Sequence, residues 1–547
     1  MIRRLRLPLS VSFVLLALLA SAKYASATNY YINCAAGSNG SGTQASPWNS
    51  LASPNAHTFA PGDYIYFNRG TTCYGLFYPL GSGNASAPIT VTAYGTGALP
   101  TIDGQSNWAV FNLSDQSYWS IENLQLLHGK TYGLYVYSCN DTAVTNIYIA
   151  NISATDATYV MQYVEDSGEI YMATCKPGAN GEWDGSTINN VYINGITTGN
   201  TTVSEGIFIR GGDDVAAVNG GYKGNNIWVG NSTVSNVHGN GILIVDAQNS
   251  GESANVVSLT GQCTTNCGSQ NPGSVWVWNS TNMTMEWNES YSNSSWGAYD
   301  GGGMDIDTYN TNVTAEYNYL HDNQGYCICV LGTGGVTTTN SIIRFNVCVN
   351  NNNVAVNPSG VQVGLQGDFY LSVWDGGLLN GVQIYNNTSY YDSTMAHNAE
   401  FQDFVPASSF GTSIPSFYKN NLVYSNLQYP GMVNAWTPFT LSNNLYFTSA
   451  GAPTYYFGWN GTWWDSFDTY QTESGQDAYS MVVNPLLGDP GYDGGATPTN
   501  QYEPQSGSPA IGAGVNVCAG ISGCSMGSND FLGKPLPSTL WIGAIQE

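Results

Sequence analysis

The feature that most constrains this chain is a loose repeat in its middle, from about residue 118 to 440. Where insertions are absent the repeat is 28 to 30 residues long, and equivalent asparagines recur at Asn288, Asn318, Asn346 and Asn387. The residues before each asparagine alternate between apolar and polar, so each strand has one buried face. A unit of this size cannot bury that face alone and must stack on its neighbours. We therefore expect stacked β coils in which the asparagines form an internal amide ladder.

A second register aligns short strands that mostly open with glycine. They are Gly133–Val136, Gly206–Ile209, Gly241–Ile244, Gly303–Ile306 and Gly360–Val363, with Tyr326–Cys329 in the same slot between the last two. Counting from the first residue of each strand, positions +1 and +3 should point inward and positions +2 and +4 outward. The alignment places Cys327 and Cys329 inward. It places Tyr135, Phe208, Asp305 and Gln362 in one outward column, and Arg210 and Asp307 in the next.

The composition agrees with turn-rich β structure and excludes several classes of protein. Only 9% of the residues are charged, while Gly counts 64, Tyr 38 and Trp 15. Such a chain is unlike a disordered one and poor in helix formers. Against 12 Lys and Arg there are 37 Asp and Glu. Nucleic acid and anionic membrane surfaces would be repelled, so the expected partners are neutral molecules or cations.

Residues 1–27 are typical of a secretory signal peptide. Arg3, Arg4 and Arg6 precede an apolar core, and Ala25 and Ala27 form a small-x-small cleavage site. We expect a secreted protein, extracellular or periplasmic, that acts as a monomer. All 11 cysteines follow the leader, so disulfides are expected and one thiol must remain. The candidate pairs are Cys34–Cys73, Cys139–Cys175, Cys263–Cys267 and Cys518–Cys524, with a bridge to Cys348 from Cys327 or Cys329.

The repeat resembles the right-handed parallel β-helix of the pectate-lyase-like superfamily. Tyr30–Ile32, Pro61–Asp63 and Ala87–Val91 are similar to the entry coils of secreted β-helix proteins, and Ser506–Ile511 with Ile542–Ala544 to their closing segment. The resemblance implies one all-β, single-chain solenoid. We divide it into a cap with first coils (28–117), β-helix repeats (118–440), and a C-terminal part (441–547) with an aromatic insertion and a tail packed along the side. A separate carbohydrate-binding domain is the alternative interpretation of that last part.

The densest chemical feature is the segment from Asp300 to Asp307. Asp305 and Asp307 lie two apart on one strand, so they share a face with Cα atoms roughly 6.5 Å apart. Asp300 lies in the preceding turn, and the glycines between allow close approach. His238 occupies the same turn slot in an earlier coil, and Arg210 shares the outward face. Paired carboxylates suit glycoside hydrolysis, in which crowding raises the pKa of one group so that it acts as the acid.

This segment is similar to the lacto-N-biosidase family, whose acid and nucleophile are aspartates seven apart on one coil. Asp300 and Asp307 have that spacing. The resemblance implies a hydrolase of a neutral or weakly charged oligo- or polysaccharide that needs no cofactor. Sugar rings stack on aromatic faces. The expected substrate-binding side chains are Tyr135, Phe208, Trp296, Tyr299 and Gln362.

Two alternatives stay open. Acidic residues at β-helix turns are often calcium ligands, and Asp213, Asp214 and Asp246 fit that description. A calcium-assisted polysaccharide lyase would then be the second candidate, with Lys130 in the turn slot of His238 and Asp300 as a basic residue. The third candidate is a non-catalytic surface β-helix that binds glycans without turnover.

Overall fold

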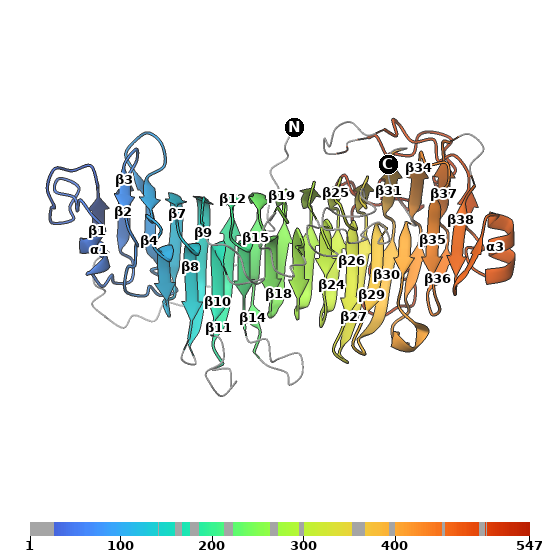
Figure 1. Cartoon of the computed structure of the whole chain (residues 1–547), viewed down its shortest axis with the longest axis horizontal. Helices are drawn as coiled ribbons and strands as arrows, with labels where there is room; N and C mark the ends of the chain where they lie inside the picture. Colours follow the sequence, from blue (N-terminus) through green and yellow to red (C-terminus); the bar gives the residue numbers. More distant parts are fainter. Residues whose placement is uncertain are drawn as a thin grey trace.

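The computed structural model describes residues 27–139, 142–158, 167–175, 185–212, 222–262, 272–294, 300–352, 367–392, 400–450, 454–491, 498 and 500–546. Its strands stack side by side along one long axis, from the N-terminal coils at one end to α3 at the other (Figure 1). Almost every strand pair in the stack is parallel, as between β13 (Glu205–Arg210) and β17 (Asn240–Val245). The predicted all-β parallel β-helix is therefore confirmed.

One sheet of 13 strands forms the first face of the solenoid. Its strands are β6 (Ala109–Ser114), β8 (Tyr132–Ser138), β10 (Gly168–Thr174), β13, β17, β20 (Val275–Trp278), β23 (Met304–Ile306), β26 (Ile328–Gly332), β29 (Phe369–Val373), β32 (Phe401–Asp403), β35 (Gly431–Ala435), β38 (Tyr456–Trp459) and β39 (Thr462–Trp464). Only β38 and β39 pair antiparallel in this sheet. This face carries the acidic segment.

A second sheet of 27 strands makes two further faces, because β7 (Trp119–Leu127) and β9 (Ala143–Thr155) are long enough to run through both. The first row is β1 (Asn29–Ile32), β2 (Tyr64–Asn68), β4 (Ile89–Tyr94), β7, β9, β11 (Thr187–Asn194), β14 (Gly224–Asn225), β15 (Ile227–Gly230), β18 (Ala247–Ser253), β21 (Thr281–Glu286), β24 (Thr311–Glu316), β27 (Thr337–Arg344), β30 (Leu378–Tyr385), β33 (Phe417–Lys419) and β36 (Thr440–Ser442). The second row is β3 (Thr72–Tyr74), β5 (Thr101–Asp103), the ends of β7 and β9, β12 (Thr197–Thr201), β16 (Thr233–Val237), β19 (Val256–Ser258), β22 (Glu289–Tyr291), β25 (Tyr319–His321), β28 (Val347–Val349), β31 (Thr388–Tyr391), β34 (Leu422–Ser425), β37 (Leu445–Thr448) and β40 (Met481–Val482).

The inward side chains of all three faces form one continuous apolar core, from Ile32 in the first coil to Tyr470 beyond the last. It is made largely of isoleucine, valine and leucine, whose branched side chains pack well on pleated strands. Burial of these side chains against those of the adjacent coils is what holds a coil in place, since a single coil has too little apolar surface of its own.

The asparagine ladder predicted from the repeat is present and is longer than expected. The Nδ2 of Asn318 donates to the Oδ1 of Asn346 at 2.9 Å, and Asn288, Asn346 and Asn387 continue the chain of bonds. Asn255, Asn421 and Asn444 extend it in both directions. These amides are buried, so each satisfies both its own polar atoms and the backbone of the turn.

Both ends of the solenoid carry a helix. The short α1 (Ala52–Asn55) lies beside the first coils, and α3 (Phe467–Ser474) covers the last one (Figure 1). In α3 the Ser466 side chain caps the first turn, Gly475 ends the helix with a φ of +70°, and Tyr470 is fully buried against Phe457. A 3-10 turn at Ala407–Ser409 is the remaining helical element of the described chain.

The tail after β40 returns along the side of the solenoid. Tyr502, Phe531 and Ile542 pack in one apolar cluster with outward residues of β25, β28 and β34. The Ala544 N–H donates to Thr388 Oγ1 in β31 at 2.9 Å, and the C-terminus lies beside β31 (Figure 1). The Glu316–Arg344 ion pair, 2.7 Å long, is buried under this tail, since Arg344 also donates to the Ser525 carbonyl.

Four disulfides lie within the described chain. The expected Cys34–Cys73, Cys139–Cys175 and Cys518–Cys524 pairs are confirmed, and Cys348 bridges to Cys327. Cys329 is a buried free thiol. Cys263 and Cys267 lie outside the described residues.

The glycine register predicted from sequence is wrong in three respects. It omitted the coils of β10 and β20, it set Tyr326–Cys329 one residue out of step, and it assigned to Gly360–Val363 the slot that β29 occupies. Met304 pairs with Ile328 and Asp305 with Cys329, so Cys329 points outward, whereas we expected it inward. A slip of one residue moves every side chain of a strand to the opposite face.

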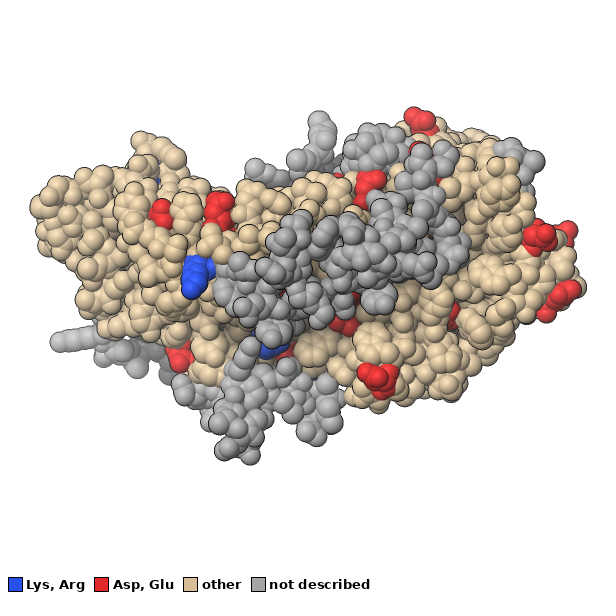
Figure 2. All heavy atoms as spheres, in the orientation of Figure 1, with Lys and Arg blue, Asp and Glu red and all other residues tan. Residues whose placement is uncertain are grey.

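The visible face of the solenoid carries few charged side chains (Figure 2). Figure 2 shows acidic side chains scattered over the visible face, with very few lysines or arginines among them. Within the described ranges, no helix is long and apolar enough to cross a membrane.

Candidate active site

Asp305 is positioned by β23, the three-residue strand of the 13-stranded face. Met304 and Ile306 on either side belong to the central core, so the alternation of the strand turns Asp305 away from it. Its lateral neighbours are Trp276 on β20 and Cys329 on β26, which lie in small apolar clusters outside the central core. Asp305 is 5% exposed. It therefore lies on the outer side of the sheet, in a sheltered environment.

The hydroxyl of Tyr326 joins Asp300 to Asp305. It is 3.3 Å from Asp300 Oδ1 and 3.3 Å from Asp305 Oδ2, so these two carboxylate oxygens lie within twice that distance of each other. A phenol has one hydrogen to donate. Two full hydrogen bonds at the same time require one carboxyl to be protonated and to donate to the phenol oxygen; otherwise the single hydrogen is divided between the two carboxylate oxygens. The geometry thus favours a shared proton on this pair.

The glycines before β23 make room for this arrangement. A Cβ on Gly302 would lie 2.1 Å from the Tyr326 ring, and one on Gly303 would lie 3.0 Å from the Cys327 carbonyl. The close approach that we expected of a glycine run is therefore made by the tyrosine ring. Any larger residue at 302 would displace the hydroxyl that links the two carboxyls.

Burial keeps protons on this cluster. It raises the pKa of Asp300 to about 6. The pKa of Asp305 is raised well above its usual value, first by burial and then by the charges of Asp307 and Asp300. Burial also raises the pKa of Tyr326 and of Cys329, so both remain donors, and Cys329 Sγ lies 2.8 Å from Asp305 Oδ1. The sequence argument relied on crowded charges, but burial is the larger cause.

Asp307 follows β23 directly, two residues after Asp305, and its N–H donates to the Val277 carbonyl of β20 at 3.1 Å. It is half-buried, and the Thr308 N–H donates to its Oδ1 at 2.6 Å. The negative charge of Asp307 raises the pKa of Asp305. The structure therefore brings together a buried Asp305 with Asp300 and Asp307, which are both half-buried but have different hydrogen-bonding partners.

Arg210 does not belong to this cluster, contrary to our prediction. It lies on β13, with β17 and β20 between it and β23. Its Nε is 3.6 Å from Asp246 Oδ2, and both side chains are buried. Asp246, one of the three predicted calcium ligands, is therefore engaged with this arginine. Its carboxylate has an arginine partner and accepts from Asn279 Nδ2 at 2.6 Å.

His238 is also further from Asp300 than predicted. It precedes β17, while Asp300 precedes β23, and β20 lies between the two strands. Equivalent positions are then two strand spacings apart, roughly 10 Å. The side chain is half-buried, and burial lowers its pKa. The error arose because β20 does not open with the glycine that defined the register.

The predicted aromatic residues divide into two groups. Phe208 is fully buried, with the Arg210 guanidinium over its ring and Tyr171 stacked on it, so it cannot contact a substrate. Tyr135 remains half-exposed and packs with Trp108, whose ring centroid is 5.3 Å away and whose surface is 42% exposed. Tyr135 lies several coils before Asp305 on the same outer face.

Five predicted residues lie outside the described residues: Trp296, Tyr299, Gln362, Asp213 and Asp214. The column position assigned to Gln362 belongs to Tyr370, since β29 is the strand that pairs with β26. Sequence reasoning missed Tyr326, Cys329, Trp276 and Tyr370 around Asp305. The segment Val275–Trp278, in which valine and tryptophan alternate, was the signal that could have placed Trp276.

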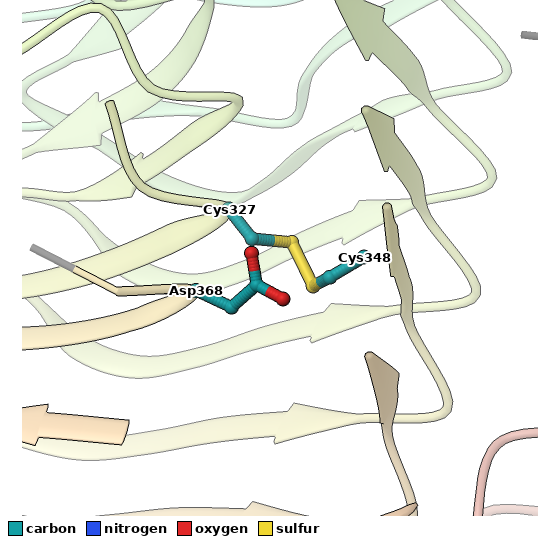
Figure 3. Close-up of side chains that lie close together, drawn as sticks. All are labelled: Cys327, Cys348 and Asp368. Atoms are coloured by element: carbon teal, nitrogen blue, oxygen red, sulfur yellow. A yellow bond between two sulfur atoms is a disulfide. The ribbon is translucent and has the colours of Figure 1, made fainter. Parts of the chain in front are cut away.

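Three further residues of types that often bind metals lie close together, but they do not form a metal site. Cys327, Cys348 and Asp368 each place one candidate ligand atom within 4.8 Å of the others. The two sulfurs are bonded to each other at 2.00 Å, and the Asp368 carboxylate lies beside the disulfide (Figure 3). A disulfide has no thiolate to offer a metal ion.

The fold and the site define a class of protein, a parallel β-helix with a carboxyl cluster on the outer side of one strand. No family model matches the chain. It is 23% identical over 619 residues to the lacto-N-biosidase of Bifidobacterium longum subsp. longum, an alignment that covers 95% of this chain and 36% of that protein.

Solved structures support the fold. The native crystal structure of GH136 lacto-N-biosidase from Eubacterium ramulus is similar with a TM-score of 0.55 and 20% identity, covering 67% of this chain and 64% of that one. Its selenomethionine derivative gives a TM-score of 0.54 and 19% identity over the same shares. The chain thus spans little more than a third of the curated relative and just under two thirds of the solved one.

Proposed function

We propose that the protein is a secreted glycoside hydrolase that cleaves a neutral or weakly charged oligo- or polysaccharide with Asp300, Asp305 and Asp307. The observation that carries the proposal is the convergence of these carboxyls, of which Asp300 has a pKa raised to about 6. Glycosidases need one carboxyl held as an acid beside another held as a carboxylate. The similarity to lacto-N-biosidases supports the same reaction class.

The environments of the three aspartates suggest different roles. Asp300, half-buried and linked to Tyr326, has a pKa raised to about 6 and would protonate the leaving-group oxygen. Asp307, half-buried with its Oδ1 held by the Thr308 N–H, would attack the anomeric carbon and form a glycosyl ester. Asp300, then ionised, would take a proton from the water that cleaves the ester. This assignment follows the seven-residue spacing and gives retention of configuration.

Asp305 would act through the other two. Its raised pKa keeps it protonated beside the Tyr326 hydroxyl. Through this hydroxyl it can stabilise the Asp300 carboxylate while Asp300 has lost its proton. We regard it as a positioning residue.

The test uses Asp300→Asn, Asp305→Asn and Asp307→Asn in the full chain. We expect hydrolysis of p-nitrophenyl glycosides, including the lacto-N-bioside, and of a glycan panel to fall by roughly 10²–10⁴-fold for Asp300 and Asp307, and less for Asp305. Azide should restore turnover to an Asp307→Ala variant through a glycosyl azide. The matched control is Asp375→Asn, at an exposed turn with a φ of +48°, which asparagine tolerates.

Full activity in all three asparagine variants would remove the cluster from the mechanism. If the wild type turns over only uronate-containing glycans and yields unsaturated products that absorb in the ultraviolet, the reaction is a lyase elimination and the proposal is wrong.

We further propose that the chain is exported and acts as a monomer. Residues 1–27 have the pattern of a signal peptide, and the four disulfides of the described chain are typical of an oxidising compartment. Mass spectrometry of the mature N-terminus and light scattering of the purified protein test the two statements.

A further inference from the structure

A hollow of about 230 Å³ lies on the outer surface of the 27-stranded sheet, away from the aspartate cluster. It is formed by β7, β9 and β11, which are consecutive neighbours in the sheet, and by the turn that precedes β4. These strands lie toward the N-terminal end of the solenoid (Figure 1). The coil of β9 is five strand spacings from β24, the strand that follows Asp307, or roughly 24 Å along the axis.

Two exposed tyrosines form the floor of this hollow. Tyr148 on β9 and Tyr192 on β11 pair in register, and they are 41% and 43% exposed. Their backbone positions are therefore about one strand spacing apart, and both side chains lie on the surface. Exposed large aromatic rings in register, beside a hollow, mark an interaction site more often than isolated ones do.

Amide side chains line the same hollow. Asn146 and Asn190 occupy equivalent positions in β9 and β11, between the pairs Thr145–Asn189 and Ile147–Val191, and both have the left-handed backbone, with φ of +58° and +52°. Asn190 Nδ2 donates to Thr145 Oγ1 at 3.0 Å, which fixes its orientation. Asn146 is exposed. The Asn190 Oδ1 accepts from Asn226 Nδ2 at 3.0 Å, so both amide atoms of Asn190 are engaged within the sheet. The Asn146 Nδ2 donates to Thr145 Oγ1 at 2.9 Å, which orients the exposed amide of Asn146 next to the aromatic faces.

The wall is a tight turn built against Tyr118. Asn84 and Ala87 exchange backbone hydrogen bonds of 3.1 and 3.0 Å, and the Asn84 side chain accepts from the Ser86 N–H. A Cβ on Gly83 would lie 2.6 Å from the Tyr118 carbonyl, so glycine is needed for the turn to approach β7. The backbone hydrogen bonds and the close packing of this turn therefore fix the shape of the hollow.

The chemistry of the lining indicates its occupant. No residue that lines the hollow is charged, so an anionic or cationic ligand finds no counter-charge there. Aromatic faces with neighbouring amides and hydroxyls suit a ring that has apolar C–H faces and polar edges. At about 230 Å³ and open on one side, it is smaller than pockets that enclose a drug-sized ligand, about 300–1,000 Å³. The hollow therefore suits a ligand that lies across its open side and is not enclosed by it.

We propose that this surface is a non-catalytic binding site for a neutral glycan, in which pyranose rings lie on Tyr148 and Tyr192 and hydrogen-bond to the exposed amide of Asn146. Such a site would hold a polysaccharide strand on the solenoid independently of the aspartate cluster. The inference does not depend on the proposed hydrolase activity, because it concerns binding at another face.

The experiment is affinity electrophoresis of the full chain in native gels that contain hydroxyethylcellulose, galactomannan, laminarin or, as an anionic comparison, polygalacturonate. We expect at least one neutral polymer to retard the wild type and polygalacturonate to have no effect. The Tyr148→Ala/Tyr192→Ala double variant should lose the retardation, with at least a tenfold rise in the dissociation constant. Calorimetry with the matching soluble hexasaccharide distinguishes binding of a short chain from binding that needs a polymer.

Two controls separate binding from folding and catalysis. Tyr479→Ala removes another exposed tyrosine, 75% exposed, and should leave retardation unchanged. Asn146→Gly keeps the left-handed backbone and removes one amide, so it should weaken binding less than the double variant does. Hydrolysis of a small aryl glycoside, where the wild type shows it, should be equal in wild type and double variant. Absence of retardation in every neutral gel, or equal retardation of the double variant with an unchanged melting temperature, would overturn the proposal.

Discussion

At the scale of single residues, the site depends on one hydroxyl. Tyr326 is fully buried, lies 3.3 Å from both Asp300 and Asp305, and its hydrogen bond lowers the pKa of Asp300 against the effect of burial. Without that bond, burial would act alone and Asp300 would hold its proton to a higher pH. The hydroxyl therefore sets how readily Asp300 releases a proton.

This argument predicts the pH dependence of a Tyr326→Phe variant. The pKa of Asp300 should rise by about one to two units, because a hydrogen bond to a charged group contributes about 1.5–3 kcal/mol. If Asp300 is the general acid, the alkaline limb of kcat/KM moves to higher pH by that amount, and kcat falls about tenfold or more. A pH–rate profile on an aryl glycoside measures both.

The control is Tyr370→Phe. The Tyr370 ring stacks on that of Tyr326 at 6.0 Å, so the variant keeps the packing of the aromatic pair. Its alkaline limb should coincide with that of the wild type. An alkaline limb that stays in place in Tyr326→Phe would show that the hydroxyl does not control the acid.

At the scale of the strands and turns, the buried asparagine ladder holds the coils in register. Asn318 accepts from the Asn288 backbone N–H at 2.9 Å and from its side chain at 3.2 Å, and donates to the Met285 carbonyl and to Asn346. Replacement by alanine leaves several buried polar groups unsatisfied at once. Each such group costs about 1–3 kcal/mol.

We therefore expect Asn318→Ala to lower the free energy of unfolding by at least about 2–3 kcal/mol and the melting temperature by several degrees. Asn312→Gly is the matched control, because Asn312 belongs to an exposed ladder and has a φ of +57°, which glycine adopts freely. This substitution should change the free energy of unfolding little. Calorimetric melting of the two variants compares them directly, and equal losses would contradict the role of burial.

The strands around Asp305 show which features of the site could be predicted from the sequence and which could not. The outward direction of Asp305 followed from its place between Met304 and Ile306, since alternation on a strand is a local property. The register at Cys329 did not follow, because Tyr326 to Val330 is apolar throughout and offers no alternation to anchor it. Arg210 could not be placed because its distance from Asp305 depends on how many coils intervene, and β20 carries no glycine at the expected position.

At the scale of the whole molecule, the solenoid buries many carboxyl groups without a cation beside each one. Burial raises the pKa of Glu169 to about 7, of Asp368 to about 6 and of Asp403 to about 8. Glu252 and Glu400 are raised well above their usual value for the same reason. In the unfolded chain these groups titrate near 4. The folded protein therefore binds more protons than the unfolded chain between about pH 4 and about pH 8.

The stability contributed by a group whose pKa is raised on folding is fully present below its unfolded pKa and is lost as the pH rises through its folded pKa. The melting temperature should accordingly fall from about pH 5 to about pH 8, and the excess of 37 acidic over 12 basic residues adds repulsion in the same direction. Glu169→Gln keeps the bond from the Ala157 N–H but removes the titrating group, so it should flatten this slope. Glu473→Gln, on the exposed side of α3, should not. Differential scanning calorimetry across the range measures all three proteins, and a wild-type melting temperature that is constant or rises with pH would show that the buried carboxyls are ionised in the folded state.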